Sequence, residues 1–482
     1  MDTRRCTYGH SNLYEFGPRF AARGRREWHL PSRNSTIRAL LRSRNYLKMV
    51  VIPTPVTTPA KAKTVAKLPN SYKHDLAVRT VQIPPSGASS PWLDASKPYV
   101  PVFQEQYGTH LTANETSSYY TLSESGQAGI EVATASLHEL FFDATAYVLA
   151  HEAEMAPFFH IPSALWPKIQ RSFRENKRDT VSGRFDFALT EDGIKVYEYN
   201  ADSASCLFEC GHTQDEWSRA AGVDSIGRSS STTLFSQLVD AWKGKNVDGI
   251  LHLLCDDDHE ERYHSMYMMS AAQAAGIDCV LVVGVDSLSW SNGAIADVNG
   301  REIRNVWKTW AWQTVISQFE ASLEAPQKRV QVMDVMLHDD VRVFEPLWTV
   351  LPSSKAILPI LSQLAPENPY LLRASFDEAA VATYVGGYVA KPVMGRTGAN
   401  VSIYDAEHQL ISATAGKWDQ DTIVYQEIAL LPQYDDGKYV QVNTWAIDGK
   451  YGGTVLRIDE SNIIGLSSGI HAMRVVADEV VA

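Results

Sequence analysis

The chain has 482 residues, 45% of them hydrophobic, which is enough to bury a large core divided into roughly two or three subdomains. No apolar run approaches the roughly 18 residues of a membrane span, and this excludes a transmembrane helix. The five cysteines form no CxxC pair, which argues against a disulfide framework or a zinc site and favours a reducing compartment such as the cytoplasm. The net charge of −12 disfavours nucleic acid as a partner and suits a polycationic ligand.

The N-terminal region differs in charge from the rest of the chain. Residues 1–50 hold eleven Lys and Arg against three Asp and Glu, a composition that resembles a mitochondrial transit peptide but equally fits a disordered tail. Residues 51–100 are rich in Pro, Thr, Ser and Lys, as is typical of a linker. We therefore expect residues 1–88 to form a disordered or targeting-like extension and residues 89–478 to form the folded domain.

Residues 117–176 are poor in glycine and include HELFFDATAYVLAH, which has helical spacing. The segment GRFDFALTEDGIKVYEYN that follows predicts a β-hairpin. Both arms alternate, and EDG suits a three-residue loop with Gly193 in the left-handed conformation. In that register Asp186 opposes Glu198, and Arg184 opposes Asn200. The residues that then share the other face are Phe185, Phe187, Tyr197 and Tyr199.

The four polar side chains of this hairpin indicate a cation site. Two directly opposed carboxylates, Asp186 and Glu198, repel each other unless a cation lies between them. With Asn200 they offer hard oxygen ligands that suit Mg²⁺, which usually arrives with substrate phosphates. Arg184 adds a fixed fork for a phosphate or a developing oxyanion. The alternative explanation is an exposed polar face on an ordinary hairpin.

Two short apolar runs, GILHLLCDDD and CVLVVGVDSL, flank a helical segment and predict a β-α-β unit with parallel strands. After residue 380 the pattern changes to strands and hairpin turns that are typical of an antiparallel sheet, so the fold class is α/β to α+β. The first run continues into CDDDHEERYH (255–264), and strand ends are where α/β sheets bind ligands. We interpret this acidic segment as a loop whose negative field suits an amine, although a solvated acidic loop explains it equally well.

The segment YVAKPVMGRTGANVSIYD predicts a strand, a glycine-spaced loop and a second strand. Gly395 and Gly398 let backbone N–H groups approach an anion, and Arg396 adds positive charge. The loop therefore fits either a flap over phosphates or an ordinary glycine-bearing hairpin. Lys391, on the preceding strand, fits either a contact with the α- or β-phosphate or the solvent-facing position usual for an isolated strand lysine. The YQEIAL segment (425–430) suits an adenine held through the backbone.

Six ordered blocks over roughly residues 90–476 resemble the synthetase domain of glutathionylspermidine synthetase and trypanothione synthetase. They are GRFDF…VYEYNADSAS, VWKTWAWQT, PSSKAILP, YVAKPVMGRTGANVS, YQEIALLP and GGTVLR. The resemblance implies an ATP-grasp fold, with ATP between two subdomains beneath a glycine-rich lid. It also implies that the glycine carboxylate of glutathione is joined to an amine of spermidine through an acyl phosphate, with ATP and Mg²⁺.

The resemblance assigns roles to individual residues by motif. It implies that Asp186, Glu198 and Asn200 bind magnesium. The residues that it places at ATP are Arg184, Lys355, Lys391, Gly395, Arg396, Gly398, Gln426, Glu427, Ile428, Ala429 and Gln441. Those that it places at the substrates are Ser203, Glu261 and Thr314 for glutathione and Glu260 for the polyamine. Those that it places in catalysis are Arg184, Lys391 and Arg457.

Many members of this family carry an amidase domain ahead of the synthetase, and only about 90 residues precede the matching blocks here, so we expect no hydrolysis of the conjugate. Two other functions stay open: a related C–N ligase acting on another peptide or amine, and a non-catalytic ATP-grasp-like binding protein. The expected partners are small molecules, namely glutathione, a polyamine and ATP, without nucleic acid or membrane.

Overall fold

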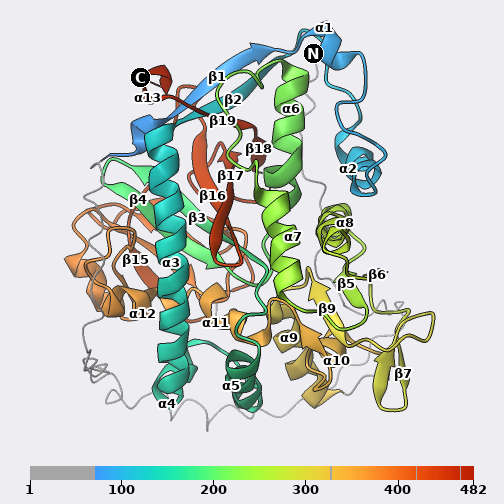
Figure 1. The fold of residues 1–482 in the computed structure, drawn as a ribbon. Coiled ribbons are helices and arrows are strands. Elements are labelled where there is room, and N and C mark those ends of the chain that lie inside the picture. The colour runs from blue at the N-terminus through green and yellow to red at the C-terminus, as the bar shows by residue number, and fades with distance from the viewer. Residues whose placement is uncertain (1–70, 326–327, 419–420, 467, 482) are drawn as a thin grey trace, which may run out of the picture. The chain divides into compact units, whose positions relative to one another are not determined.

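The computed structural model of the protein describes residues 71–325, 328–418, 421–466 and 468–481, which belong to one compact unit. Helices and strands alternate in part of this unit and strands cluster in another, so the predicted class, α/β to α+β, is confirmed (Figure 1). Within these residues no helix combines the length and the apolar character needed to cross a membrane. Residues 1–70, most of the predicted N-terminal extension, lie outside the described part.

The sheet that carries the predicted hairpin has five antiparallel strands in the order β18-β17-β16-β3-β4. These strands are β3 (Ser182–Thr190), β4 (Gly193–Asn200), β16 (Tyr439–Ile447), β17 (Lys450–Asp459) and β18 (Gly469–His471). The long helix α3 (Glu124–Ala150) contacts β4, β16 and β17 and crosses this sheet in Figure 1. Phe141 of α3 packs edge-on against Phe185 and Tyr199, whose rings stack with centroids 4.0 Å apart. Because side chains alternate along a strand, burying the aromatic face leaves the other face for polar groups.

The hairpin pairs as predicted at its open end but differs at its turn. Asp186 lies opposite Glu198, which confirms that part of the register. At the turn Thr190 pairs with Gly193, whose φ is 112°, so the loop has two residues and the predicted three-residue loop is wrong. The shorter loop slips the register by one residue, and a β-bulge at Tyr197 restores it before Glu198 is reached.

The bulge also changes the face on which one predicted residue lies. Val196, rather than Tyr197, pairs with Phe187 and is fully buried on the aromatic face. Tyr197 instead packs against the small cluster around Ala188, on the polar side of the hairpin. The prediction that Tyr197 belongs to the aromatic face is therefore wrong, because the extra residue of a bulge shifts the alternation of the strand.

The predicted β-α-β unit is confirmed, and two further strands extend its parallel sheet to the order β10-β9-β5-β6. Its elements are β5 (Leu251–Cys255), α8 (His259–Ala274), β6 (Cys279–Val283), β9 (Asn305–Lys308) and β10 (Arg342–Val343). Helix α8 begins at His259, with the side chain of Asp258 accepting hydrogen bonds from the N–H groups of Glu260 and Glu261. The interpretation of 255–264 as a loop is thus wrong beyond Asp258, since an N-cap starts a helix there.

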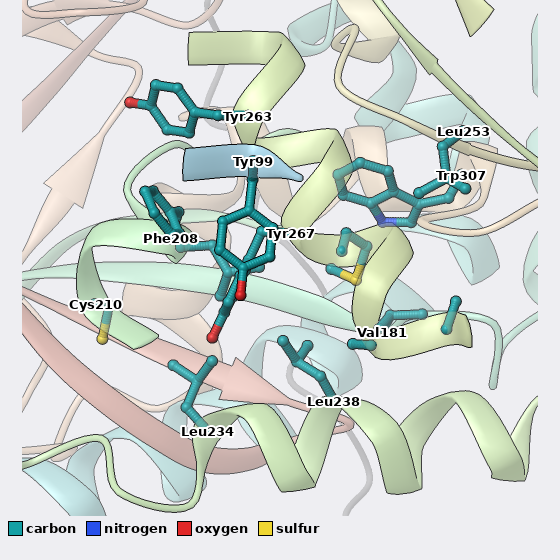
Figure 2. Packing of buried hydrophobic residues seen from close by; sticks show 14 of the residues in the cluster. Tyr99, Val181, Phe208, Cys210, Leu234, Leu238, Leu253, Tyr263, Tyr267 and Trp307 are labelled. Atoms are coloured by element: carbon teal, nitrogen blue, oxygen red, sulfur yellow. The ribbon is translucent and has the colours of Figure 1, made fainter. Parts of the chain in front are cut away.

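Aromatic side chains from four segments pack together beside this sheet (Figure 2). Tyr99 of α2 (Tyr99–Tyr107) lies edge-on to Phe208 and to Tyr267 of α8, at 5.1 and 5.3 Å between centroids. Leu234 and Leu238 of α7 (Leu234–Gly244) belong to the same buried cluster. Burying an aromatic or leucine side chain contributes about 1.5–3 kcal/mol, so this cluster fixes α8 against the segment that leaves the hairpin.

A second five-stranded antiparallel sheet, in the order β11-β15-β12-β13-β14, carries the glycine-spaced loop between β12 and β13. Its strands are β11 (Ala374–Ser375), β12 (Tyr388–Pro392), β13 (Ser402–Tyr404), β14 (Leu410–Ala413) and β15 (Ile423–Glu427). The sequence pattern predicted one antiparallel sheet for the strands after residue 380, and this prediction is wrong. These strands divide among three sheets, because β16 pairs with β3 and with β17, whereas the last strand, β19 (Met473–Val476), pairs in parallel with β2.

A three-stranded sheet, in the order β1-β2-β19, joins the two ends of the described chain. Strand β1 (Leu76–Gln82) pairs with β2 (Thr116–Ser123), so folded structure begins within the range that we assigned to the extension. The remaining helices and strands are α1 (Pro85–Ala88), α4 (Glu152–Met155), α5 (Trp166–Glu175), α6 (Gln214–Ala221), β7 (Ser289–Ser291), β8 (Ala294–Ala296), α9 (Trp312–Glu324), α10 (Val332–Met336), α11 (Val350–Ser353), α12 (Ile357–Leu364) and α13 (Asp478–Val481).

Candidate active site

The hairpin brings its four predicted polar residues together on one face. Arg184 pairs with Asn200 across β3 and β4, next to the Asp186–Glu198 pair. The amide nitrogen of Asn200 lies 3.4 Å from Oδ2 of Asp186 and 3.5 Å from Oε1 of Glu198. Both carboxylates and the Asn200 amide therefore lie together at one place, as a hard-cation site requires.

Arg184 and Asp186 form a buried bidentate ion pair. Nε and Nη2 of Arg184 donate to the two oxygens of Asp186 at 2.8 and 3.1 Å, and Nη1 donates to the carbonyl of Ser205 at 2.9 Å. Burial opposes the charge of the guanidinium, but the adjacent Asp186 carboxylate raises the pKa of Arg184 above its ordinary value. The arginine thus stays charged in a fixed position beside the hairpin carboxylates.

Two lysines from outside the hairpin complete a cluster of alternating charge. Lys355, in the turn between α11 and α12, places Nζ 2.8 Å from Oε2 of Glu198. Burial by itself raises the pKa of Glu198, but the charges of Lys355, Lys391 and Arg184 outweigh it and lower this pKa to about 2. Lys391 of β12 donates to Oε1 of Gln426 at 2.6 Å, and burial, with the nearby Lys355 charge, lowers its pKa to about 7.

The glycine-spaced loop folds back on the hairpin exit. Gly395 accepts a hydrogen bond from Lys355 at its carbonyl, and Nη2 of Arg396 donates to the carbonyl of Ser203 at 3.0 Å. Gly398 has a φ of 73°, and a Cβ there would lie 2.6 Å from the carbonyl oxygen of Ile464. A larger residue at 398 would push the loop away from this position.

The segment predicted to hold adenine lies on the edge of the same cluster. Gln426 is buried and binds Lys391, whereas the side chain of Glu427 forms an ion pair with Arg373 at 2.8 Å. The N–H of Ile428 donates to Gly387 at 3.1 Å, and the carbonyl of Ala429 accepts the hydroxyl of Tyr197. These backbone groups are paired within the protein, and their contact with adenine stays a prediction.

Gln441 and Arg457 lie opposite each other on β16 and β17, at the side of the sheet away from β4. Arg457 donates to Oγ of Ser468 at 2.7 Å and to the carbonyl of Gly465 at 2.7 Å. Gln441 accepts a hydrogen bond from Asn443 at 3.0 Å. The guanidinium of Arg457 is thus held by the segment that follows β17, on the same sheet as Arg184.

The predicted substrate residues lie on segments next to the hairpin exit. The hydroxyl of Ser203 donates to the carbonyl of Thr309, and Thr314 lies in the first turn of α9. That turn is tied to the hairpin exit, because the N–H of Trp312 donates to Oδ2 of Asp202 at 2.8 Å. Ser203 and Thr314 are therefore brought to the same region, as the predicted glutathione site requires.

The two predicted acids of α8, Glu260 and Glu261, both have a raised pKa. Burial raises the pKa of Glu261, and the hydrogen bond from Thr309 and the charge of Arg396 oppose this rise. Burial and the charges of Glu209, Glu261 and Asp258 raise the pKa of Glu260 to about 8, against the opposing charge of Arg457. A carboxyl with a pKa this high ionises readily only when a cation arrives.

Sequence reasoning missed Asn443, which is fully buried on β16 opposite Asp186. Its Nδ2 donates to Oδ1 of Asp186 at 2.7 Å and to Oε1 of Gln441, while its own Oδ1 is buried without a hydrogen-bond partner. The available signal was the alternation of Gln441 and Asn443 with buried valines in YVQVNTW, which indicates a polar stripe on one strand face.

The donor set suits magnesium better than a metal that needs several His or Cys ligands. Among the residues that the structure describes, no three His, Cys, Asp or Glu side chains gather to hold a metal ion. The hairpin offers two carboxylates and one amide oxygen, and Mg²⁺ is commonly held by one or two carboxylates together with water and substrate phosphates. The buried, unpartnered oxygen of Asn443 fits the same oxygen chemistry.

A family model described as "Glutathionylspermidine synthase preATP-grasp" matches residues 93–475. The bifunctional glutathionylspermidine synthetase/amidase of Escherichia coli (strain K12) is 38% identical over 399 residues, which are 80% of this chain and 63% of that protein. The trypanothione synthetase of Crithidia fasciculata is 35% identical over 409 residues, which are 81% of this chain and 62% of that protein. This chain thus spans less than two thirds of the length of either relative. A putative acid–amine ligase of Haemophilus influenzae is 25% identical over 378 residues, which are 75% of this chain and 90% of that protein.

Proposed function

This chain belongs to the glutathionylspermidine synthase family, and on that premise we propose that it is an ATP-dependent carboxylate–amine ligase. The proposed substrates are glutathione, through its glycine carboxylate, and a polyamine such as spermidine. The observation that carries this proposal is the juxtaposition of the opposed Asp186 and Glu198 with Arg184, Lys355 and the glycine-spaced loop.

The cationic side chains are suited to bind ATP phosphates. Lys355 and Lys391 approach from the second antiparallel sheet and its neighbouring turn, and Arg184 approaches from the hairpin. Asp186, Glu198 and Asn200 would hold magnesium, which would neutralise the charge of the bound phosphates. Without the positive charge of magnesium, Lys355 balances the Glu198 carboxylate and Arg184 balances the Asp186 carboxylate.

The chemistry proposed needs no protein nucleophile. The glycine carboxylate of glutathione attacks the γ-phosphorus of ATP, the bond to the bridging oxygen breaks, and ADP leaves with the formation of an acyl phosphate. The amine nitrogen then attacks the acyl carbon, inorganic phosphate leaves, and the nitrogen loses a proton. Arg184 and Lys391 would act by position and charge on the oxygens where negative charge develops.

The segments beside the hairpin supply the proposed substrate contacts. Ser203, Thr314 and Glu261 would bind glutathione, and Glu260 would bind the cationic amine. Binding an ammonium beside Glu260 would offset the cost of ionising that carboxyl, which is a reason for a partly buried acid at this position. The prediction that the chain lacks amidase activity is untested and stays a prediction.

The test is a ligation assay with purified full-length chain, glutathione, spermidine, ATP and Mg²⁺. The expected products are ADP, phosphate and a glutathione–spermidine conjugate of the mass given by loss of one water. Glu198→Gln should abolish the conjugate, and Glu191→Gln, which changes an exposed acid of the hairpin turn, should not. ADP formation only with another peptide or amine would support a related C–N ligase, and nucleotide binding without any turnover would support a binding protein.

A further inference from the structure

A buried lysine lies at the end of β9, the strand of the parallel sheet that leads into α9 (Figure 1). Lys308 is 1% exposed, and its Nζ donates a hydrogen bond to the carbonyl of Asp202, in the segment that leaves the hairpin. The same Nζ lies 5.3 Å from the ring centroid of Trp312, the first residue of α9. Because a buried ammonium is costly unless its surroundings replace the lost water, packing alone does not explain a lysine here.

Trp312 is bound to both ends of the hairpin. Its backbone N–H donates to Oδ2 of Asp202 at 2.8 Å, and its indole Nε1 donates to the carbonyl of Glu345 at 2.8 Å. The carboxylate of Glu345 accepts the N–H groups of Val181 and Ser182, where β3 begins, at 2.9 Å each. Glu345 has a φ of 56°, which is uncommon for a residue other than glycine. The start of β3, the exit of β4 and the start of α9 thus share one buried network.

Lys308 supplies the positive charge of this network. Burial lowers the pKa of Lys308 to about 8, and the charges of Asp202 and Glu345 oppose that fall. The amine is therefore mostly charged at neutral pH. Its charge attracts one acid at the exit of the hairpin and another that binds the start of β3, so it draws both ends of the hairpin toward the same point.

The network joins the segments that carry the two halves of the proposed site. The hairpin holds the proposed magnesium ligands, Ser203 directly follows Asp202, and Thr314 lies two residues after Trp312. We infer that Lys308 is a positioning residue, which holds the hairpin exit against α9 and so aligns the reacting carboxylate with the ATP phosphates. The inference rests on the proposed function and adds to it a residue that acts through its neighbours. Because a displacement of about 1 Å can lower a rate about hundredfold, such a residue can act without touching a substrate.

The test replaces Lys308 by methionine, which keeps an unbranched apolar side chain and removes the ammonium. Conjugate formation by the full chain is measured with ATP, Mg²⁺ and spermidine at varied glutathione concentration. For Lys308→Met we expect KM for glutathione to rise at least about tenfold and kcat/KM to fall about hundredfold, with KM for ATP within about twofold of wild type. A variant that is merely less stable has a smaller folded fraction, which lowers the apparent kcat but leaves both KM values unchanged.

Lys245→Met is the matched control. Lys245 is also buried, but its Nζ donates to the carbonyl of Arg178 at 2.7 Å and to Oδ1 of Asp448 at 2.6 Å, rather than to the hairpin exit. Both variants should lower the melting temperature, and Lys245→Met should keep the wild-type KM for glutathione. An equal rise of this KM in the two variants would overturn the inference.

Trp312→Phe checks the same network without changing Lys308. It removes the indole donor to Glu345 but keeps an aromatic ring and the backbone N–H, and should raise KM for glutathione about threefold to tenfold, with KM for ATP unchanged. If Lys308→Met does not fold, the KM of Trp312→Phe decides. If the wild-type chain forms the conjugate while both variants keep the wild-type KM for glutathione, the inference is overturned and the proposed function survives. If the wild-type chain forms no conjugate, both are overturned.

Discussion

Nζ of Lys355 lies 2.8 Å from Oε2 of Glu198 and also donates to the carbonyl of Gly395 at 2.7 Å. One lysine thus ties a proposed metal-binding carboxylate to the glycine-spaced loop. In this arrangement the charge of Glu198 is balanced by a side chain, and the same side chain is the one expected to meet ATP phosphates. Binding of ATP with magnesium would therefore exchange one counter-charge for another without leaving a buried charge unpaired.

Lys355→Ala should lower kcat/KM for ATP about tenfold to hundredfold, because a hydrogen bond to a charged group contributes about 1.5–3 kcal/mol. The measurement is steady-state ADP formation at varied ATP concentration. Lys438→Ala, which removes a lysine from a surface ion pair with Glu460, is the matched control and should leave kcat/KM unchanged. Equal effects of the two variants would contradict a role of Lys355 at ATP.

When ATP binds at pH 8, the protein should take up to about one proton from solution, at the amine of Lys391. Burial, together with the charge of Lys355, lowers the pKa of Lys391 to about 7, so its amine is mostly neutral at pH 8 in the free protein. Anionic phosphates favour the charged amine and raise that pKa, which draws in a proton. Calorimetric titration in two buffers of different ionisation heat measures this uptake.

Lys391→Arg should abolish the proton uptake, because a guanidinium stays charged at pH 8. The free protein provides a second check on the sign. Between pH 7 and 10.5 the folded chain holds fewer protons at Lys391 than the unfolded chain, so the contribution of this lysine to the free energy of unfolding rises with pH in that window. Unchanged proton uptake in Lys391→Arg would show that another group titrates.

The hairpin pairing could be predicted because strand alternation is a local property of the sequence. Opposed Asp186 and Glu198 follow from the two-residue period, and they hold in the structure. The bulge at Tyr197 could not be predicted, since its hydroxyl binds the carbonyl of Ala429, more than two hundred residues away in the chain. The bulge adds one residue to β4 and so compensates for the shorter turn. For this reason the predicted Asp186–Glu198 pair is confirmed although the predicted three-residue loop is wrong.

Long-range strand pairing limits the prediction of the rest of the site. Asn443 meets Asp186 only because β16 lies beside β3, and nothing near either residue in the sequence specifies that neighbour. The same reason explains why β15 to β17 and β19 were placed in one sheet rather than in three. Lys355 and Lys391 were predicted only through the family resemblance, since a lone lysine in a turn or strand carries little local signal.

Asn443→Ala should weaken binding of Mn²⁺, used as a magnesium substitute, in the presence of ADP. The amide holds Asp186 and Gln441 at fixed positions, and loss of a residue that orients a metal ligand typically costs about tenfold to hundredfold in metal affinity. Electron paramagnetic resonance of free Mn²⁺ measures the affinity.

Asn305→Ala is the matched control for this prediction. Asn305 is also buried, and its amide donates to the carbonyl of Asp248 at 2.7 Å on the parallel sheet. Both variants should lower the melting temperature, but only Asn443→Ala should change Mn²⁺ affinity. Equal Mn²⁺ affinity in the two variants would show that Asn443 acts on folding alone.

The KM for the amine should fall as pH rises from about 6.5 to about 8.5, because Glu260 must ionise to bind a cation. Burial and the charges of Glu209, Glu261 and Asp258 raise the pKa of Glu260, so the ionised fraction below that pKa changes about tenfold per pH unit. The amine itself, with a pKa near that of lysine, about 10.4, stays charged over this range. Glu260→Gln should show a KM that is at least about tenfold higher at pH 8.5 and nearly independent of pH.

Stability without substrate gives an independent measurement on the same group. The folded chain binds the proton of Glu260 more tightly than the unfolded chain, so the contribution of this carboxyl to the free energy of unfolding falls as pH rises from about 4.5 to about 8. Glu260→Gln removes this pH-dependent fall in the free energy of unfolding, so the variant should melt at a higher temperature than wild type at pH 8. Glu302→Gln, which changes a surface ion pair with Arg304, should not raise the melting temperature. A wild-type KM for the amine that does not depend on pH, together with an unchanged melting temperature in Glu260→Gln, would remove Glu260 from the amine site.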